Sequence, residues 1–251
     1  MNTAPSRPTN DTHNTIYDIA TWVWGAGSDF ISPDGKRTEI NSPEARRGAS
    51  DYFNLFRFMP PHNKPFTDAS VLELFFARKA ASIVAGPWLL NSLRIQKSAE
   101  LAQLLPMLGA TLLPGPSFIG GTLLVSWKHN RYPSESMELI RRLTSAEFQG
   151  EYCHISGLLP VRQNLWDNQF ITSNEYLPTF NQALQTGRGL PPIALWGMIE
   201  DRLSKTISAI WQDIYTANKS EKAVDGLDKI IARHFEHFAT RLDTTLSSSD
   251  H

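Results

Sequence analysis

The chain has 251 residues, 41% of them hydrophobic and 20% charged, a profile that excludes disordered and fibrous proteins. Its 24 Lys and Arg residues against 25 Asp and Glu residues give a net charge of -1, so no overall field attracts it to nucleic acid or anionic lipid. The one cysteine, Cys153, excludes an internal disulfide and a multi-cysteine zinc site, and we interpret it as a buried thiol without a chemical role.

The N-terminal residues 1–15 are polar and contain two prolines, so they lack the apolar centre of a secretory signal. We expect this stretch to be disordered. No segment of the chain approaches the roughly 20 apolar residues that a membrane-spanning helix needs. If Met1 is the true start of the protein, these features predict a cytoplasmic location.

A helix is predicted to begin after Ser42, which has the position of an N-cap with Pro43 in the first helical position. Apolar residues recur on one face of this helix at helical spacing. These residues are Ala45, Ala49, Tyr52, Phe53 and Phe56.

The next segment predicts a helix over roughly 68–79, a short buried strand within 80–85 and a turn at Gly86 and Pro87. A further helix is expected to start at Pro87 or Trp88. Helix, strand and helix within so few residues are typical of an α/β protein.

A second apolar stretch, ATLLP, leads to Gly120 and Gly121, which open a predicted buried strand in FIGGTLLVSW. Two helices are expected to follow, within 134–143 and 144–157. Their predicted caps are Ser134 for the first, a capping box of Thr144 and Glu147 for the second, and Gly157 as its end.

Three more helices are predicted in the C-terminal third of the chain. The first lies near 175–186 and ends at GRGLPPI, which is too rich in Gly and Pro for regular structure. The last begins after Ser220, and we expect the tail 244–251 to be frayed. Between them, a long helix places apolar residues at helical spacing, namely Ile199, Leu203, Ile207, Ile210 and Ile214.

Five sequence blocks occur in an order typical of one family. They are TWVWGAGSDFISPDGKRTEINSPEARRGASDYFNLF, FFARKAASIVAGPWLL, LLPGPSFIGGTLLVSWKHN, LIRRLTSAEFQGEYCHISGLLPVRQNLW and GRGLPPIALWGMIEDRLSKTISAI. Over residues 16–242 the chain therefore resembles the C-terminal portion of family 1 extracellular solute-binding proteins, the maltose-binding-protein-like sugar-capturing components of ABC importers. Two positions depart from the family pattern: Arg78 replaces a glycine, and Trp127 stands where proline is common.

The resemblance implies an incomplete α/β fold of the periplasmic-binding-protein-like (type II) class. Members of the family have two α/β lobes joined by crossing strands, with the ligand between them, and a Trp-rich strand end opens the portion seen here. The resemblance assigns residues 16–117 to an α/β segment of the second lobe, and 118–172 to a crossing strand and helices that belong to the first lobe. It assigns 173–243 to a return to the second lobe with its C-terminal helices. With much of the first lobe missing, the helices of 134–156 are expected to expose apolar surface.

Three of the seven tryptophans, Trp24, Trp88 and Trp196, stand at predicted element ends next to Gly or Pro and match aromatic contact positions of the family. A flat aromatic face suits the apolar face of a pyranose. The alternative for each of them is a packing role in the core. We expect the remaining four to be packing residues: Trp22, Trp127, Trp166 and Trp211.

Four other residues are candidate ligand contacts. Gly120 and Gly121 either present backbone N–H groups to ligand hydroxyls or simply bend the strand. Asp29 either accepts hydrogen bonds from a sugar or closes its own turn. Arg162 either binds ligand or forms a structural ion pair.

No motif in the sequence demands catalysis. His234 and His237 have the spacing of a metal-ligand pair, but no third ligand is in view, so we interpret them as part of a solvated helix face. Neither a nucleophile elbow nor a phosphate loop nor paired catalytic carboxylates are evident. We therefore expect a protein without enzymatic activity, metal or cofactor.

The leading functional hypothesis is a component that captures a carbohydrate between two lobes and presents it to the membrane permease of an ABC transporter. By resemblance, such a protein is periplasmic or extracellular, and its partners are the ligand, the permease and a missing N-terminal lobe. The alternative is a cytoplasmic regulatory or interaction module derived from the same fold. A glycoside-processing enzyme is disfavoured because no pair of acidic residues is evident. The sequence does not indicate which sugar is bound.

Overall fold

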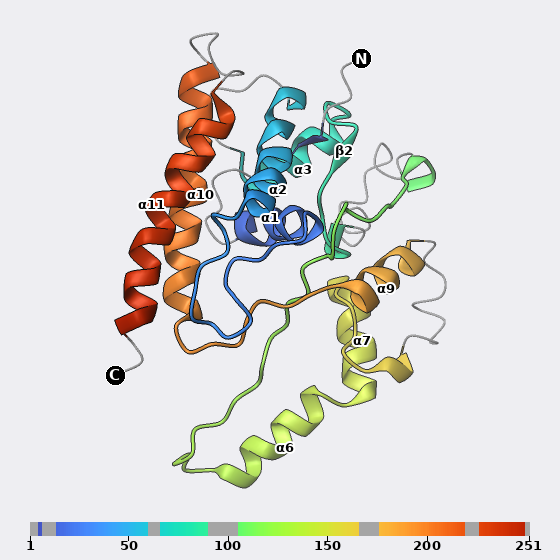
Figure 1. Cartoon of the computed structure of the whole chain (residues 1–251). Coiled ribbons are helices and arrows are strands. Elements are labelled where there is room, and N and C mark those ends of the chain that lie inside the picture. The colour runs from blue at the N-terminus through green and yellow to red at the C-terminus, as the bar shows by residue number, and fades with distance from the viewer. Residues whose placement is uncertain are drawn as a thin grey trace. The chain divides into compact units, whose positions relative to one another are not determined.

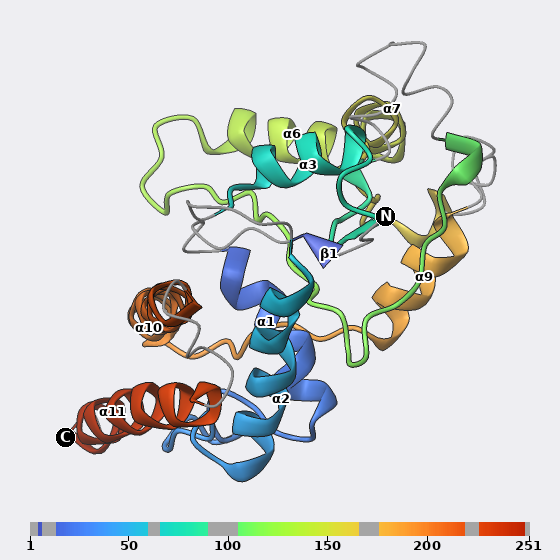
Figure 2. The ribbon, with the colours of Figure 1, turned by 90° about the horizontal axis from the view of Figure 1, so that it is seen from above.

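The structure is a computed structural model. It describes residues 5–6, 14–59, 66–89, 105–165, 176–218 and 226–248. Among these residues helices predominate, and the described strands are two short ones, β1 (Pro5–Ser6) and β2 (Ser82–Ile83) (Figures 1 and 2).

The chain divides into two compact units. Unit 1 comprises Met1–Val84, Leu112–Ile119 and Thr186–His251, and unit 2 comprises Ala85–Thr111 and Gly120–Gln185. Unit 2 brings together Tyr176 and the region around Leu108, whose carbonyl oxygen lies 3.5 Å from the Tyr176 hydroxyl group. The described residues 85–89, 105–111 and 176–185 fall in the same compact unit as the helices of 134–156.

The first helix of unit 1, α1 (Asn14–Gly25), corrects the expectation of a Trp-rich strand end. Residues 16–24 of α1 include only two, Tyr17 and Asp18, that are more than marginally exposed. A helix buried on nearly every side carries no polar stripe, so its apolar residues show no helical period in the sequence.

Helix α2 (Pro43–Asn54) begins where the sequence predicts. The Ser42 side chain accepts a hydrogen bond from the Ala45 N–H at 3.1 Å, which caps the helix, and Pro43 occupies its first turn. A 3₁₀ turn, η1 (Leu55–Phe58), continues the chain. The predicted apolar face is buried except for Phe56, which is half-buried.

Two long helices, α10 (Trp196–Asn218) and α11 (Leu227–Ser248), run antiparallel and side by side (Figures 1 and 2). Helix α10 packs against α1, and α11 packs against α2. All five predicted apolar positions of α10 are buried. The expected fraying of 244–251 is wrong as far as Ser248, because Leu246 is buried in the core and holds the last turns of α11 in place.

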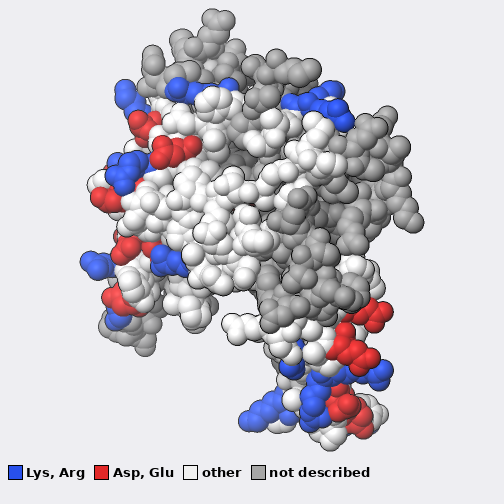
Figure 3. Space-filling view, turned by 90° about the vertical axis from the view of Figure 1, so that its right-hand side faces the viewer, with Lys and Arg blue, Asp and Glu red and all other residues white. Residues whose placement is uncertain are grey.

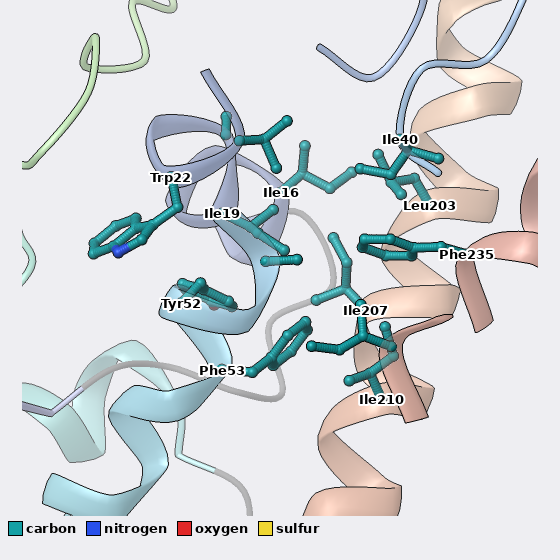
Figure 4. Close-up of a cluster of buried hydrophobic side chains, with 14 of the residues drawn as sticks. Ile16, Ile19, Trp22, Ile40, Tyr52, Phe53, Leu203, Ile207, Ile210 and Phe235 are labelled. Carbon is teal, nitrogen blue, oxygen red and sulfur yellow. The ribbon is translucent and has the colours of Figure 1, made fainter. Parts of the chain in front are cut away.

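The core of unit 1 lies where these four helices meet. Figure 4 shows Trp22 from α1, Tyr52 and Phe53 from α2, Ile207 from α10 and Phe235 from α11 converging on one apolar cluster. Aliphatic and aromatic side chains fill this region, so the hydrophobic effect is the main force that holds the four helices together.

The N-terminal stretch 1–15 is not disordered throughout, because β1 (Pro5–Ser6) pairs in parallel with β2 (Ser82–Ile83) and α1 starts at Asn14. Backbone hydrogen bonding to β2 holds β1 in place. The predicted strand in 80–85 is confirmed as β2, but Ser82 is exposed and Ile83 only half-buried.

Two other features of this part of the chain follow the sequence. Helix α3 (Asp68–Phe76) matches the prediction at its start and ends three residues earlier than expected. A predicted helix after the Gly86–Pro87 turn begins at residue 88, and all but its first two residues lie outside the described part of the chain.

Unit 2 contains α6 (Pro133–Leu143), α7 (Ala146–Ser156), α9 (Leu177–Thr186) and the short 3₁₀ turns η2 (Leu105–Met107) and η3 (Gln163–Leu165). The predicted helices exist, but two caps differ. Ser134 does not cap α6, since Tyr132 is the N-cap residue and makes no side-chain cap hydrogen bond. The cap of α7 is Ser145, one residue after Thr144, and Ser145 accepts from the Phe148 N–H. Gly157 ends α7 with a φ of 75°, as predicted.

The segment 120–127 is not the buried strand that the sequence predicts. It has no strand pairing in the structure as described, and it is exposed along its whole length. The side chains of Leu123 and Trp127 are 87% and 90% exposed. An apolar strand is buried only when other strands flank it, and no described segment pairs with this one.

None of the helices in the described parts of the chain is long and apolar enough to cross a membrane. On the face shown in Figure 3, acidic and basic side chains are intermingled and do not form a patch of one sign. This distribution agrees with the balanced charge of the sequence.

Candidate functional site

The candidate site in unit 1 begins at the C-terminal end of α1. The Trp24 indole N–H donates a hydrogen bond to Oδ1 of Asp29 at 3.0 Å, and the Phe30 backbone N–H donates to the same oxygen at 2.7 Å. Gly27, with a φ of 91°, turns the chain so that Asp29 faces back toward the helix end. Asp29 therefore closes its own turn, one of its two predicted roles.

Arg188, from the GRGLPPI segment, completes this arrangement. One of its guanidinium nitrogens, Nη2, forms an ion pair with Oδ2 of Asp29, and the guanidinium carbon lies 5.3 Å from the centre of the Trp24 ring. Trp24 and Asp29 are buried, whereas the Arg188 side chain is 48% exposed. The three residues form a layered unit with Arg188 outermost, which we call the Arg188 cluster.

The backbone on both sides of the Arg188 cluster is fixed. The Arg188 N–H donates to the Ser117 carbonyl at 2.8 Å, and the Ile119 N–H donates to the Arg188 carbonyl at 2.9 Å. These two bonds form a parallel bridge between Phe118 and Arg188. The sequence analysis missed Arg188. An arginine within a Gly- and Pro-rich loop, where side chains are seldom needed for packing, was the available signal.

Aromatic rings adjoin the cluster on its apolar side. The Phe30 ring lies 6.2 Å from Trp24 and 6.4 Å from Trp196, the first residue of α10. Trp24, Asp29 and Trp196 thus belong to one neighbourhood in the structure, which the sequence did not predict. Trp196 is half-buried, so part of its ring remains accessible.

A second aromatic pair lies beside the Phe118–Arg188 bridge. Tyr17 and Phe118 stack with ring centres 4.1 Å apart, and the Tyr17 hydroxyl donates to Oε1 of Glu200 at 2.9 Å. This contact anchors the bridge to α1 and α10, which also carry Trp24 and Trp196.

The other predicted contact residues belong to unit 2. The Trp88 indole folds over Gly86, where an added Cβ would lie 2.7 Å from the indole nitrogen. Gly120 and Gly121 are exposed. Arg162 donates from Nε to the Thr144 carbonyl at 2.7 Å, so the expected ion pair is replaced by a bond to the C-terminal end of α6.

The tryptophans expected to pack behave differently from one another. Trp22 and Trp211 are buried in the core of unit 1, as predicted. Trp127 is exposed, so its predicted packing role is wrong for this structure, because the strand around it is unpaired. Trp166 lies outside the described residues.

The remaining polar candidates do not form a site. His234 Nε2 lies 2.8 Å from Oδ2 of Asp213, which also binds Arg233 at 2.5 Å. Within the described residues, no group of three His, Cys, Asp or Glu side chains is placed to hold a metal. Cys153 is half-buried and not fully buried as expected, and burial raises the pKa of its thiol.

Comparison with solved structures places this arrangement in a known fold. The chain superposes with a TM-score of 0.75 and 17% identity on the sugar-binding protein MalE of Xanthomonas citri, over 99% of this chain and 59% of that one. A solute-binding protein of Thermotoga lettingae bound to α-D-tagatose superposes with a TM-score of 0.68 and 13% identity, over 98% of this chain and 60% of that one. UgpB of Mycobacterium tuberculosis in complex with glycerophosphocholine superposes with a TM-score of 0.67 and 16% identity, over 100% of this chain and 60% of that one. No protein-family model matches the sequence, and neither does any curated protein.

The chain therefore has part of the α/β fold of type II periplasmic binding proteins, as the sequence predicts. It spans about 60% of the length of these structures. Each of the three is a binding protein, and two are shown with a small solute.

Proposed function

We propose that this chain is the carbohydrate-binding component of an ABC importer and that it captures a sugar or related polyol. The observation that carries the proposal is its match, over nearly its whole length, to several sugar-binding solute-binding proteins. The Arg188 cluster supports it, because guanidinium donors beside aromatic rings suit both the hydroxyl groups and the apolar face of a sugar.

The proposed contact residues in unit 1 are Trp24, Asp29 and Trp196, of which Trp196 has a ring that is only half-buried. In unit 2 the proposed contacts are Trp88, Gly120, Gly121 and Arg162. We also propose that the protein acts outside the cytoplasmic membrane and delivers its ligand to permease subunits, the role of the family that its sequence resembles.

A titration against a panel of sugars tests the proposal. Maltose, maltotriose, glucose, tagatose and glycerol are added to the full chain while tryptophan fluorescence and the heat of binding are measured. We expect saturable but weak binding of at least one sugar, with a dissociation constant of roughly 0.1–10 mM, because a chain that spans part of the fold encloses less of its ligand.

Trp196→Ala provides the matched variant, with Trp127→Ala as its control because Trp127 is exposed and lies in the other unit. Loss of the sugar response in the first variant and its retention in the second would agree with the proposal. A correctly folded wild-type chain that shows no saturable response to any sugar would contradict the prediction that this chain alone binds a ligand.

We further propose that the apolar face of unit 2 packs against the part of the fold that this chain does not span. By the apolar face of unit 2 we mean its strongly exposed apolar side chains, Leu123, Val125, Trp127, Ile155 and Val161, each more than 60% accessible. An exposed apolar surface of this kind is typical of an interaction site. The missing two fifths of the neighbours' length supply the candidate occupant: an α/β lobe that pairs with 120–127.

For the isolated chain, the lobe proposal predicts strong binding of the dye ANS and self-association as the concentration rises. Replacing Leu123 and Val125 by Ser should reduce ANS fluorescence severalfold and shift the mass measured by light scattering toward the monomer. Unchanged ANS fluorescence in this variant would contradict the proposal. A stable dimer that binds no ANS would instead identify a second copy of the chain as the occupant.

The alternative function is a regulatory or interaction module that reuses the fold without transport. The exposed apolar face of unit 2 is the observation that favours it, since such a module needs a protein-binding surface. The DNA next to the coding sequence separates the two. A reading frame for a signal peptide and a further lobe, continuous with this one, favours the transport component, and its absence favours the module.

A further inference from the structure

The order of the three residues in the Arg188 cluster determines which of them a ligand can reach. Trp24 is 6% exposed, its N–H is bonded to Asp29, and one face of its ring is covered by the Arg188 guanidinium group. A pyranose therefore has no open indole face to stack on at this position. Trp24 lies behind the binding surface.

Asp29 is equally committed to other residues. Its Oδ1 accepts from the Trp24 indole and the Phe30 backbone, and its Oδ2 pairs with Arg188. The Asp29 side chain is only 11% exposed and both of its oxygens are engaged. Bonding a ligand would therefore leave another buried group without its hydrogen bond.

Arg188 is the accessible member. Its backbone is held by two hydrogen bonds to the 117–119 segment, and its guanidinium is held from behind by Asp29 and Trp24. A guanidinium group carries five N–H donors, and about half of this side chain is open to solvent. The group is thus fixed in position before a ligand arrives, which reduces the entropy lost on binding.

We infer that Arg188 is a ligand-contacting residue of unit 1 in addition to Trp196, that Trp24 and Asp29 are positioning residues behind Arg188, and that Arg188 selects a neutral polyhydroxylated ligand. This inference rests on the proposed function. It replaces two of the contacts expected from the sequence with one residue that the sequence analysis did not identify.

Charge is the reason for a neutral ligand. Asp29 already compensates Arg188, so the pair presents hydrogen-bond donors with little net positive charge. Glu200, bonded to Tyr17 beside the Phe118–Arg188 bridge, adds a second carboxylate to the neighbourhood. A phosphate or carboxylate ligand would compete with Asp29 for the guanidinium, whereas hydroxyl oxygens accept from its remaining N–H groups and leave the ion pair intact.

The experiment pairs each neutral ligand with a charged form of the same molecule: glucose with glucose 6-phosphate and glucuronate, and glycerol with glycerol 3-phosphate. Affinities of the full wild-type chain are measured at low and moderate salt. We expect the neutral members to bind at least tenfold more tightly than the charged members, with little dependence on salt.

Variants then test the individual roles. Arg188→Ala and Arg188→Lys should both weaken neutral-ligand affinity about tenfold or more, since lysine keeps the charge but not the planar set of donors. Trp24→Phe keeps a ring and removes the N–H that holds Asp29, so it should weaken affinity severalfold. Circular dichroism and thermal melting confirm that each variant is folded.

Asp29→Asn gives the readout that a purely structural role would not change. It keeps an oxygen that can accept the two hydrogen bonds but leaves the Arg188 charge uncompensated, so affinity for glucose 6-phosphate should rise relative to glucose. Wild-type affinity that survives in folded Arg188→Ala would overturn this inference alone, as would tighter binding of the charged members. Failure of every ligand to bind the folded wild-type chain would overturn the proposed function as well.

Discussion

Trp211→Ala should lower the free energy of unfolding by about 3–5 kcal/mol, the usual cost of deleting a large buried aromatic side chain. Trp211 is 1% exposed and lies on α10 with its ring 5.6 Å from Tyr52 and 5.0 Å from Phe53, both in edge-on geometry. The deletion removes these contacts and leaves a cavity where α2 meets α10. Urea denaturation followed by far-UV circular dichroism measures the change.

Trp127→Ala is the matched control for this prediction. The same kind of side chain is removed, but Trp127 is 90% exposed, so the free energy of unfolding should change by less than about 0.5 kcal/mol. Similar losses in the two variants would show that Trp211 is not a core residue, or that the surface around Trp127 is covered in solution.

Gly48→Ala should destabilise unit 1 by about 1–3 kcal/mol, because the two helices α1 and α2 approach too closely for a side chain there. A Cβ at Gly48 would overlap the Trp22 carbonyl oxygen and lie 2.8 Å from its carbonyl carbon and 3.0 Å from the Ala26 Cβ. The Trp22 carbonyl group is backbone and cannot rotate away as the end of a flexible side chain would. Thermal and urea unfolding of the variant give the size of the effect.

Gly197→Ala, on α10 of the same unit, separates this steric effect from helix propensity. An added Cβ at Gly197 meets nothing within 4 Å, and alanine is the better helix former by up to about 1 kcal/mol. This variant should be neutral or slightly more stable than the wild type. Equal destabilisation of the two variants would contradict the close approach of α1 and α2.

Local signals explain which helices the sequence could predict. Helix α2 has a serine cap, a proline in its first turn and an apolar face, and α10 has five apolar residues at helical spacing, so both were identified. Helix α1 has no such signal, because Ile16, Ile19, Val23 and their neighbours are buried on nearly every side. Apolar residues recur at helical spacing only when one face of a helix is buried and the opposite face is exposed to solvent, and α1 has little exposed surface.

The error at 120–127 has a different origin. An apolar run such as TLLVSW correctly indicates a need for cover, but it contains no information about which segment supplies the cover. In the structure as described, Leu123, Val125 and Trp127 have none. A sequence pattern thus predicts how a segment behaves inside a completed sheet, and the sheet itself is a property of the whole fold.

The candidate site was predictable in part. Trp24, Asp29 and Trp196 were singled out by their positions near turns and element ends, and they do lie in one neighbourhood. Their partner Arg188 is 159 residues from Asp29 in the chain, and only the fold brings the two together. The same contact changes what Trp24 and Asp29 can do, because it occupies the ring face and the carboxylate oxygen that a ligand would otherwise use.

The bridge between Phe118 and Arg188 has a consequence for how such chains vary in length. Everything between these two residues leaves and re-enters unit 1 at points joined by hydrogen bonds, so an insertion or deletion within 120–185 leaves their spacing unchanged. Lengthening a closed loop costs little free energy, since the cost grows only with the logarithm of its length. This segment is therefore where related chains can gain or lose whole elements while the guanidinium group of Arg188 stays in register with the end of α1.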